Sequence, residues 1–361
     1  MVNTFFRKSG YLAAFILPAL VVGGHLLGGW WNLATVAFIF VVIPVADAVV
    51  GVDDRNLSEP ERTEAPEDPY FRLVTWLWVP VQLLFLGWAM KEITTVGSII
   101  SMQGLLLMLN TGLVAGGIGI TVAHELGHKN NRFEQFLSKT LLLTLSYMHF
   151  FIEHNRGHHI HVATTEDPAT ARNGESFYRF WVRSVVDGYG HAWQLEAESR
   201  ERKGKAGYGL GNRMYRYTMA PLAFAAVAGY VAVQLTPATP VWLVPAFFFG
   251  QAIIGFTLLE LVNYVEHYGI LRRKDANGRY ERVNPLHSWN TSYLISNFFL
   301  FQLQRHSDHH TYASKRYQSL DHFDESPQLP YGYPTMILIA LLPPLWFRMM
   351  DPVLAAWEKS R

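Results

Sequence analysis

The chain has 361 residues, of which 50% are hydrophobic and 16% are charged, and its formal net charge is +1. Soluble domains are usually about one quarter charged, so this composition favours a membrane protein. The near-neutral charge indicates no particular partner, and the lack of cysteine excludes disulfide bonds, thiolate metal sites and iron–sulfur clusters within the sequence.

Six apolar stretches are long enough to cross a bilayer as helices, which takes about 20 residues each. They cover residues 11–29, 30–51, 72–90, 98–123, 217–235 and 241–264. The first is expected to be a retained span rather than a cleavable signal peptide. The sequence therefore predicts an all-α polytopic membrane protein with six transmembrane helices.

The six stretches form three pairs joined by short internal connectors, whereas the connectors between pairs are long and charged. Of the 30 Lys and Arg, only Lys91 lies in a connector within a pair. The positive-inside rule then places the short connectors outside and both termini in the cytoplasm. We expect a single integral-membrane domain over residues 1–361, with a cytoplasmic helical cap formed by 124–216 and 265–361.

Shorter apolar runs at 137–152, 293–303 and 335–350 are not clear spans. We expect them to be half-buried or interfacial helices. The acidic, proline-containing stretch 52–70 is expected to be a solvated loop.

Nine of the 15 histidines fall into four tight clusters close to the ends of the predicted spans. The clusters follow spans four and six or lie in the long segments after them, so all four are expected on the cytoplasmic side. Histidine is a neutral metal ligand near pH 7. The nine are His124, His128, His154, His158, His159, His267, His306, His309 and His310.

The spacing of these histidines indicates two metal ions rather than one. His124 and His128 are four residues apart and share one face of a helix. Adjacent pairs, such as His158 and His159, diverge by about 100° on a helix and so can point to two different ions. Nine imidazoles are too many for one ion and about right for two. His267 has no neighbour at ligand spacing, and its assignment rests on its position after span six.

The motif HELGH also matches the HExxH signature of zinc proteases, in which Glu125 would be the general base. A zinc protease needs three protein ligands and an open position, so the remaining histidines would be superfluous. A metal-bound histidine usually donates its other N–H to a carboxylate or carbonyl. The carboxylates close to the clusters are Glu125, Glu153, Asp167, Glu266 and Asp308, and the alternative for each is a solvated charge.

The ligand type narrows the identity of the metal. Imidazole suits zinc, copper, iron and nickel, and zinc has no redox chemistry. Two metals with open positions beside a membrane reservoir of apolar molecules favour O₂ activation, and therefore iron.

With these motifs in view, the chain resembles the membrane-bound alkane 1-monooxygenase (alkane ω-hydroxylase) family. That family belongs to the histidine-rich membrane di-iron superfamily, together with the fatty-acid desaturases and xylene monooxygenase. The shared boxes are HxxxH, HxxxHH and HxxHH, and the narrower signature includes NYVEHYG at 263–269 and LQRHSDHH at 303–310. The resemblance covers roughly residues 30–352, through EHNRGHH at 153–159, VATTEDPAT at 162–170, HSWN at 287–290 and KRYQSL at 315–320. Asp321 departs from the family, which has Arg at that position, and this puts the electron-donor surface in doubt.

The resemblance implies terminal hydroxylation of alkanes to primary alcohols with O₂, at two non-haem iron ions bound by the nine histidines. It implies electrons from rubredoxin, which a rubredoxin reductase reduces. Because this sequence has no cysteine, rubredoxin would be a separate protein or a fused domain outside it. The expected location is the bacterial inner (cytoplasmic) membrane, with the metal site on the cytoplasmic side.

Terminal selectivity requires a narrow apolar channel that presents only the chain end. Its expected walls are the helices that lead to the ligands, through Ile39, Ile43, Leu113, Gly117 and Ile120. Ile39 and Ile43 share a face of span two with Asp47 and are candidates for limiting chain length. The alternative for Gly117 and its neighbouring glycines is close helix packing.

An acidic electron donor would need a basic face. The candidates are Arg202, Lys203, Lys205, Arg213, Arg272, Arg273 and Lys274. These residues equally suit anchoring against anionic lipid. Rival functions are a fatty-acyl desaturase or aryl-methyl hydroxylase of the same superfamily, an intramembrane zinc metalloprotease, and a non-catalytic metal or haem protein.

Overall fold

A computed structural model describes residues 4–360 of the chain. Within that range the regular structure is helical, and β pairing is confined to isolated bridges, so the all-α prediction is confirmed. The α-helices are α1 (Thr4–Gly10), α2 (Ile16–Leu27), α3 (Ala34–Ala37), α4 (Ile43–Val50), α5 (Glu59–Glu64), α6 (Pro69–Val96), α7 (Met102–Val114), α8 (Ile120–Gly127), α9 (Arg132–Thr144), α10 (Phe150–Glu153), α11 (His159–His161), α12 (Phe177–Glu201), α13 (Arg213–Leu235), α14 (Leu243–His267), α15 (Leu294–Phe299), α16 (His306–Thr311), α17 (Tyr333–Ala340) and α18 (Pro343–Ser360).

Shorter helical turns connect several of these helices. Three are 3₁₀ turns, at Tyr11–Phe15 (η1), Gly29–Leu33 (η2) and Tyr317–Ser319 (η6). Three are π turns, at Phe38–Val42 (η3), Ala115–Gly119 (η4) and His154–His158 (η5). A π turn closes its hydrogen bonds between residues five apart, and such turns are frequent at functional sites.

Six helical stretches of the described chain are long and apolar enough to cross a membrane, as predicted. They are Arg7–Leu27, Gly29–Val50, Pro69–Val96, Met102–Gly127, Arg213–Leu235 and Leu243–His267. The protein is therefore an integral membrane protein. The fourth stretch continues past its predicted end at residue 123 to include His124, and the sixth continues past 264 to end at His267. A helix satisfies its own backbone hydrogen bonds, so it can continue into polar sequence and carry a ligand on its last turn.

The chain divides into two compact units. Unit 1 comprises Met1–Ile39, Pro69–Phe151 and Trp193–Leu259, and unit 2 comprises Phe40–Asp68, Ile152–Ala192 and Glu260–Arg361. His124 and His128 belong to unit 1, whereas the other seven clustered histidines belong to unit 2.

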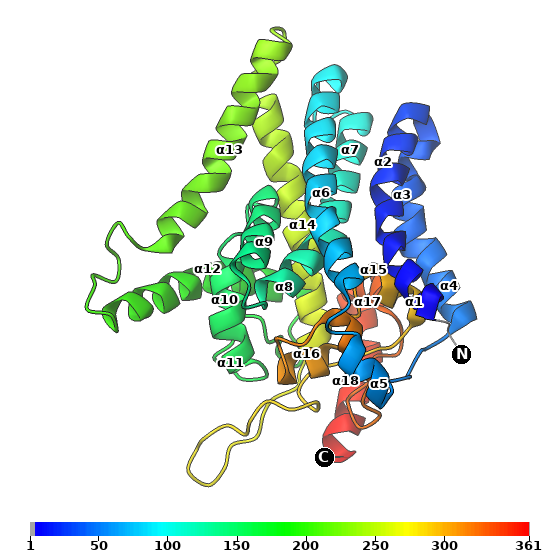
Figure 1. Cartoon of the computed structure of the whole chain (residues 1–361), viewed down its shortest axis with the longest axis vertical. Helices are drawn as coiled ribbons and strands as arrows, with labels where there is room; N and C mark the ends of the chain where they lie inside the picture. Colours follow the sequence, from blue (N-terminus) through cyan, green and yellow to red (C-terminus); the bar gives the residue numbers. More distant parts are fainter. Residues whose placement is uncertain (1–3, 361) are drawn as a thin grey trace. The chain divides into compact units, whose positions relative to one another are not determined.

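Close approach of helices characterises unit 1. α7 contacts both α2 and α6, and Figure 1 shows α6 and α7 side by side. A Cβ atom at Gly116 would lie 2.5 Å from the Cα of Gly255 on α14, and one at Gly112 would lie 2.6 Å from the carbonyl oxygen of Gln251. Small residues let helix backbones approach closely in membranes, so these glycines serve packing.

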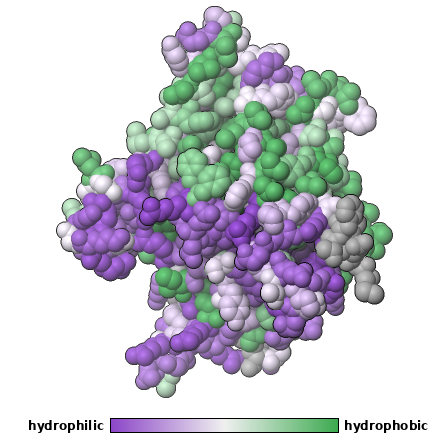
Figure 2. All heavy atoms as spheres, in the orientation of Figure 1, coloured by the Kyte–Doolittle hydropathy of each residue, from purple (hydrophilic) through white to green (hydrophobic). Residues whose placement is uncertain are grey.

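The outer surface of the long helices of unit 1 is apolar. Leu26, Leu84 and Leu235 are 73%, 75% and 77% exposed, respectively. Figure 2 shows hydrophobic residues gathered over α2, α6 and α7. Lipid tails solvate such side chains, so their exposure agrees with the membrane-crossing assignment.

Unit 2 holds α16 in place through a buried cation. The Arg305 side chain is 2% exposed. Its guanidinium donates to the carbonyl oxygens of Leu320 and Asp53, both at 2.7 Å. In the same unit, the Ser296 amide of α15 donates to Asp47 Oδ1 of α4 at 3.0 Å. Because Arg305 directly precedes α16, these bonds fix the start of the helix that carries His306, His309 and His310.

The three shorter apolar runs are helical. Residues 137–152 lie largely in α9 and α10, 293–303 contains α15, and 335–350 is divided between α17 and α18. The stretch 52–70 is not all loop, because α5 lies within it. The Ser58 hydroxyl and amide both pair with the Glu61 carboxylate at the start of α5, a capping box that stabilises a short polar helix.

Candidate metal centre

Three segments of unit 2 supply seven of the nine clustered histidines. The π turn and α11 carry His154, His158 and His159, α14 ends at His267, and α16 carries His306, His309 and His310. All are buried except His159, which is half-buried. Burial of so many imidazoles favours a shared charged partner, because an isolated buried polar group is costly.

Four of these histidines converge on one point. Their ligand nitrogens all lie within 4.8 Å of one another, and the four are His158, His267, His306 and His310. Nε2 of His306 lies 3.1 Å from Nε2 of His267 and 2.9 Å from Nε2 of His310. Nitrogens around a tetrahedral ion with bonds of about 2.1 Å are about 3.4 Å apart. The spacing therefore fits a single metal ion.

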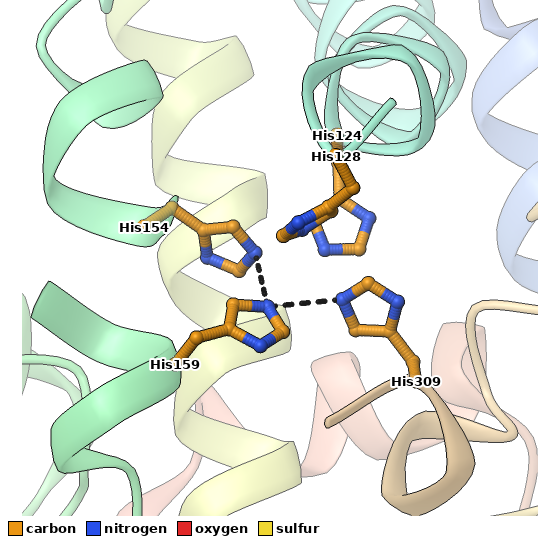
Figure 3. A group of neighbouring side chains, drawn as sticks. All are labelled: His124, His128, His154, His159 and His309. Atoms are coloured by element: carbon orange, nitrogen blue, oxygen red, sulfur yellow. Dashed lines mark hydrogen bonds between the residues drawn. The ribbon is translucent and has the colours of Figure 1, made fainter. Parts of the chain in front are cut away.

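The other three histidines of unit 2 form a second cluster. Nε2 of His159 lies 3.1 Å from Nε2 of His154 and 3.1 Å from Nε2 of His309, as the dashed lines in Figure 3 show. Adjacent residues thus belong to different groups: His158 to the first and His159 to the second. This arrangement agrees with the divergence of about 100° expected between adjacent side chains on a helix.

α16 and the π turn His154–His158 bring histidines together at different spacings along the chain. In α16 the pair that meets is His306 and His310, four residues apart, as in a regular helix. In the π turn the pair that meets is His154 and His159, five residues apart. The wider turn adds one residue, and so His154 shares its group with His159 rather than with His158. In a regular helix, His154 would instead lie on the same side as His158, four positions later.

Unit 1 contributes His124 and His128, which project from α8 and its C-terminal end. Their ring centroids lie 4.8 Å apart. Glu125, the HELGH glutamate, pairs with Lys129 Nζ at 3.0 Å, and both side chains are buried. The general base of a zinc protease must face its substrate, whereas this carboxylate is held by the Lys129 cation, four residues later and just beyond the end of α8.

Asp167 contacts the outer nitrogen of a clustered histidine. Its Oδ2 atom lies 2.9 Å from His158 Nδ1 and accepts a hydrogen bond from the Thr170 hydroxyl at 2.6 Å. Its Oδ1 atom accepts from the Ala169 amide at 3.0 Å. Burial raises the pKa of Asp167, but the charge and hydrogen bond of His158 outweigh burial and hold the pKa below its usual range. The carboxylate therefore stays ionised and accepts the Nδ1 proton of His158.

The other four predicted carboxylates have different contacts. Glu153 Oε1 lies 3.3 Å from Nδ1 of His191 on α12. Glu266 Oε1 accepts from the Tyr333 hydroxyl at 2.6 Å, and its Oε2 lies 3.1 Å from Nε2 of His306. Glu266 therefore contacts Nε2 of His306, the ring nitrogen that also lies next to His267 and His310. The expected contact is with the other ring nitrogen, whose N–H would donate to a carboxylate.

Asp308 of α16 takes part in a network of charged side chains. Its Oδ2 atom accepts from Lys315 Nζ at 2.6 Å and from the Asp321 amide at 2.7 Å. Lys315 also donates to Asp321 Oδ2 at 2.6 Å, and Arg62 donates to the same oxygen at 2.7 Å. Asp321, the departure from the family pattern, is therefore paired within unit 2.

A metal ion fits the donor set that unit 2 presents. Nε2 of His158 is buried and has no hydrogen-bond partner among the described residues, while its Nδ1 is held by Asp167. A neutral imidazole that donates from Nδ1 offers a lone pair at Nε2. This nitrogen points where Nε2 of His267, His306 and His310 converge, so the histidine-rich site is a metal site.

The predicted channel residues are mostly interior. Ile43, Leu113 and Ile120 are 3%, 7% and 2% exposed, respectively, and Ile39 and Gly117 are half-buried. The π turn Ala115–Gly119 lies between Leu113 and Ile120. It shifts the helical register by one residue, so Leu113 and His124 do not share a face as they would on a regular helix. Ile120 remains four residues before His124 on one helix.

Two of the predicted docking cations are half-buried and form hydrogen bonds within the protein. Arg213 forms two bonds with the Glu196 carboxylate, at 2.9 and 2.6 Å. Arg272 donates to the carbonyl oxygens of Ile160 and Glu281. The others are exposed: Arg202, Lys203 and Lys205 in unit 1, and Arg273 and Lys274 in unit 2.

Sequence reasoning did not single out Thr170, Tyr333, Lys315 or Arg62. Thr170 lies inside the quoted segment VATTEDPAT, three residues after Asp167, and this spacing is the one local signal. Tyr333 lies 67 residues from Glu266, so no local pattern connects them.

Comparison with known proteins gives a consistent family assignment. The family model described as fatty acid desaturase matches residues 101–340. Alkane 1-monooxygenase 2 of Pseudomonas aeruginosa is 42% identical over 97% of this chain and 93% of its own length. Alkane 1-monooxygenase of Acinetobacter baylyi is 38% identical over 93% of this chain and 83% of its own length. The hydroxylase component of a xylene/toluene monooxygenase of Pseudomonas putida is 27% identical over 70% of this chain and 65% of its own length.

Proposed function

The chain belongs to the alkane 1-monooxygenases of the fatty acid desaturase family, and we propose from this that it hydroxylates the terminal methyl group of linear alkanes. One alkane, one O₂, two electrons and two protons would give one primary alcohol and one water. The observation that supports the proposal most is the combination of near-full-length similarity with two groups of mostly buried histidines.

The proposed cofactors are two non-haem iron ions. His158, His267, His306 and His310 would hold one ion. His154, His159 and His309 would hold the other, with His124 and His128 completing the set of nine. Iron is proposed because imidazole suits it and because a monooxygenase needs a metal with redox chemistry. When bound, the two ions would supply O₂ activation.

The protein's own residues would position this chemistry. Asp167 would keep the His158 proton on Nδ1, so that Nε2 stays free to bind metal. The buried apolar side chains of α7 and α8 would exclude water and guide the substrate chain end. Ile39, Ile43, Leu113, Gly117 and Ile120 are the proposed channel residues. Replacing Ile39 with Trp should shorten the range of alkanes accepted, and an unchanged range would contradict its role.

The electrons would come from an electron-transfer partner, which monooxygenases of this family require. We propose rubredoxin, reduced by its own reductase. The exposed cations Arg202, Lys203, Lys205, Arg273 and Lys274 are the proposed docking residues, because both termini and the long charged segments are predicted on the cytoplasmic side. This orientation, the helical cap and a bacterial inner-membrane location belong to the same proposal.

The decisive experiment measures metal and product on one preparation of the full chain in detergent or nanodiscs. The expected result is two iron ions per chain and a primary alcohol from a linear alkane, dependent on reconstituted rubredoxin and its reductase. His158→Ala serves as the inactive comparison. One metal per chain, zinc in place of iron after careful purification, or no alcohol would refute the proposal.

The same assay separates the rival functions. A desaturase would yield an alkene, and an aryl-methyl hydroxylase would prefer a methylated arene to an alkane. A zinc protease built on HELGH predicts that Glu125→Gln abolishes activity, while His306→Ala and His310→Ala leave metal binding intact. The pairing of Glu125 with Lys129 favours the monooxygenase over the protease.

A further inference from the structure

His158 is held from behind by a chain of three consecutive hydrogen bonds within unit 2. The Ala163 amide donates to Thr170 Oγ1 at 2.9 Å, the Thr170 hydroxyl donates to Asp167 Oδ2 at 2.6 Å, and His158 Nδ1 lies 2.9 Å from the same Oδ2. The side chains of Thr170, Asp167 and His158 are all buried.

In each of these three hydrogen bonds, only one of the two partners can be the donor. A backbone amide can only donate, so Thr170 Oγ1 must accept from Ala163, and its own hydroxyl proton is directed to Asp167. Asp167 already accepts from the Thr170 hydroxyl at Oδ2 and from the Ala169 amide at Oδ1, so the short contact at Oδ2 is a hydrogen bond that the Nδ1 atom of His158 donates. In a neutral imidazole the lone pair then lies on Nε2, the buried nitrogen that faces the other three histidines.

The segment that carries Thr170 is itself fixed at several points. Arg183 of α12 donates to the carbonyl oxygens of Pro168 and Thr170, at 2.9 and 3.1 Å. The Gly269 amide donates to the carbonyl oxygen of Ala171 at 2.9 Å, and the Arg272 amide donates to that of Ala163 at 2.7 Å.

Ala163 also adopts φ +57°, a left-handed conformation that is uncommon for a residue with a side chain. Such conformations persist where the surrounding contacts determine them and are often found at functional sites. The left-handed turn is part of the geometry in which the Ala163 amide reaches the Thr170 hydroxyl.

The four-histidine group is unevenly supported from outside. Nδ1 of His267 and Nδ1 of His310 are buried and make no hydrogen bond with the described residues, whereas Nδ1 of His158 has a fixed acceptor. Outer partners of metal-binding histidines fix the tautomer and the ring orientation. His158 is therefore a ligand that the protein orients before metal binding.

We propose that Thr170 is a positioning residue for the metal site: its hydroxyl holds the Asp167 carboxylate in the orientation that fixes the tautomer of His158. This inference rests on the proposed metal centre and not on the identity of the substrate. Replacing Thr170 with Val removes the hydroxyl at nearly constant volume and leaves the Ala163 amide and Asp167 each without one partner. Loss of a metal site's outer partner typically weakens metal binding by about 10- to 100-fold.

The test is a Co²⁺ titration of the metal-free full chain in nanodiscs, followed by absorption spectroscopy. Wild type, Thr170→Ser and Thr165→Val should bind two Co²⁺ per chain with the same affinities, because Ser keeps the hydroxyl and Thr165 is an exposed residue of the same segment. Thr170→Val should bind one Co²⁺ normally and the other at least about tenfold more weakly. Asp167→Asn should show the same selective loss, which provides a second variant if Thr170→Val does not fold.

Two results would overturn the proposal for Thr170: unchanged affinities in Thr170→Val, or equal weakening in Thr170→Ser and Thr170→Val. Fewer than two Co²⁺ bound by the wild type would instead refute the proposed dinuclear centre. The two failures are therefore distinguished by the wild-type titration alone.

Discussion

His154 and His159 present their Nε2 atoms to each other at 3.1 Å although five residues separate them along the chain. The π turn His154–His158 makes this possible, since a regular helix would bring residues four apart together. The extra residue also directs His158 into the other histidine group. One local irregularity therefore assigns three neighbouring ligands to two groups.

At Gly157, inside the π turn, the side chains of His191 and Glu153 occupy the space that a Cβ atom would need. A Cβ at this position would lie 2.7 Å from Cε1 of His191 and 2.9 Å from Oε1 of Glu153, which is closer than real Cβ contacts. Gly157→Ala should destabilise the protein by about 1–3 kcal/mol through overpacking, and it should lower the number of metal ions bound. The unfolding free energy and the metal content of the purified protein check this.

Two further variants make the prediction about Gly157 specific. Gly190→Ala on α12 has no atom within 4 Å of the added Cβ and should be neutral or stabilising. Adding His191→Ala to Gly157→Ala removes the clashing ring and should restore metal binding. Normal metal binding by Gly157→Ala itself would show that the turn tolerates a side chain.

Single replacements of adjacent histidines should remove different ions. His158 and His159 lie in different groups, so His158→Ala and His159→Ala should each bind about one ion per chain, and the double variant should bind none. Metal analysis together with the Co²⁺ spectrum of each variant distinguishes the two sites. His161→Ala is the matched control, because this half-exposed neighbour pairs with Glu166 and belongs to neither group. Loss of both ions in either single variant would indicate one inseparable site.

The exposed cations should control the rate of electron delivery if the donor is acidic. Reversing Lys203 and Lys205 to Glu should slow reduction by rubredoxin about tenfold at low ionic strength, and the difference should shrink as salt screens the charges. Stopped-flow reduction across a salt series measures this effect. Lys91→Glu is the control, because Lys91 is predicted on the opposite side of the membrane. A reduction rate that does not depend on salt in the wild type would contradict electrostatic docking.

The spans and the histidine clusters could be read from the sequence, because length, apolarity and residue spacing determine them locally. The six spans are confirmed, with small shifts at His124 and His267. The π turns could not be predicted, since one extra residue in a turn leaves no trace in composition. The partners of Glu266 and Asp321 could not be predicted either, because Tyr333 and Arg62 lie 67 and 259 residues away from them.

Asp321 should contribute to stability through its two cations. Burial raises the pKa of Asp321, but hydrogen bonds from Arg62 and Lys315 outweigh it, so the pKa lies below its usual value. Asp321→Asn should lower the unfolding free energy by about 1–3 kcal/mol, because Lys315 and Arg62 would lose the negative charge to which both donate. Denaturant unfolding in detergent at neutral pH measures the loss. Arg55→Ala is the control: both side chains of its ion pair with Glu61 are about one third exposed, so the pair should contribute about 0–1 kcal/mol. Equal effects of the two substitutions would contradict a special role for Asp321.

His149 should make the protein less stable in mild acid. Burial lowers the pKa of His149 to about 3, and its ring lies 4.3 Å from that of Tyr147, between centroids. An unfolded histidine titrates near pH 6.5, so below this pH the unfolded chain takes up a proton that the folded chain refuses. His149 therefore leaves the free energy of unfolding unchanged above pH 6.5 and lowers it as the pH decreases toward about 3.

The expected slope for His149 is about 1.4 kcal/mol per pH unit within that window, or about 2 kcal/mol between pH 7.5 and pH 5. His149→Phe removes the titrating group while it keeps an aromatic ring against Tyr147. Wild type and variant should thus differ in their loss of unfolding free energy between pH 7.5 and pH 5, with the larger loss in the wild type. Parallel pH profiles for the two proteins would mean that His149 does not carry this acid sensitivity.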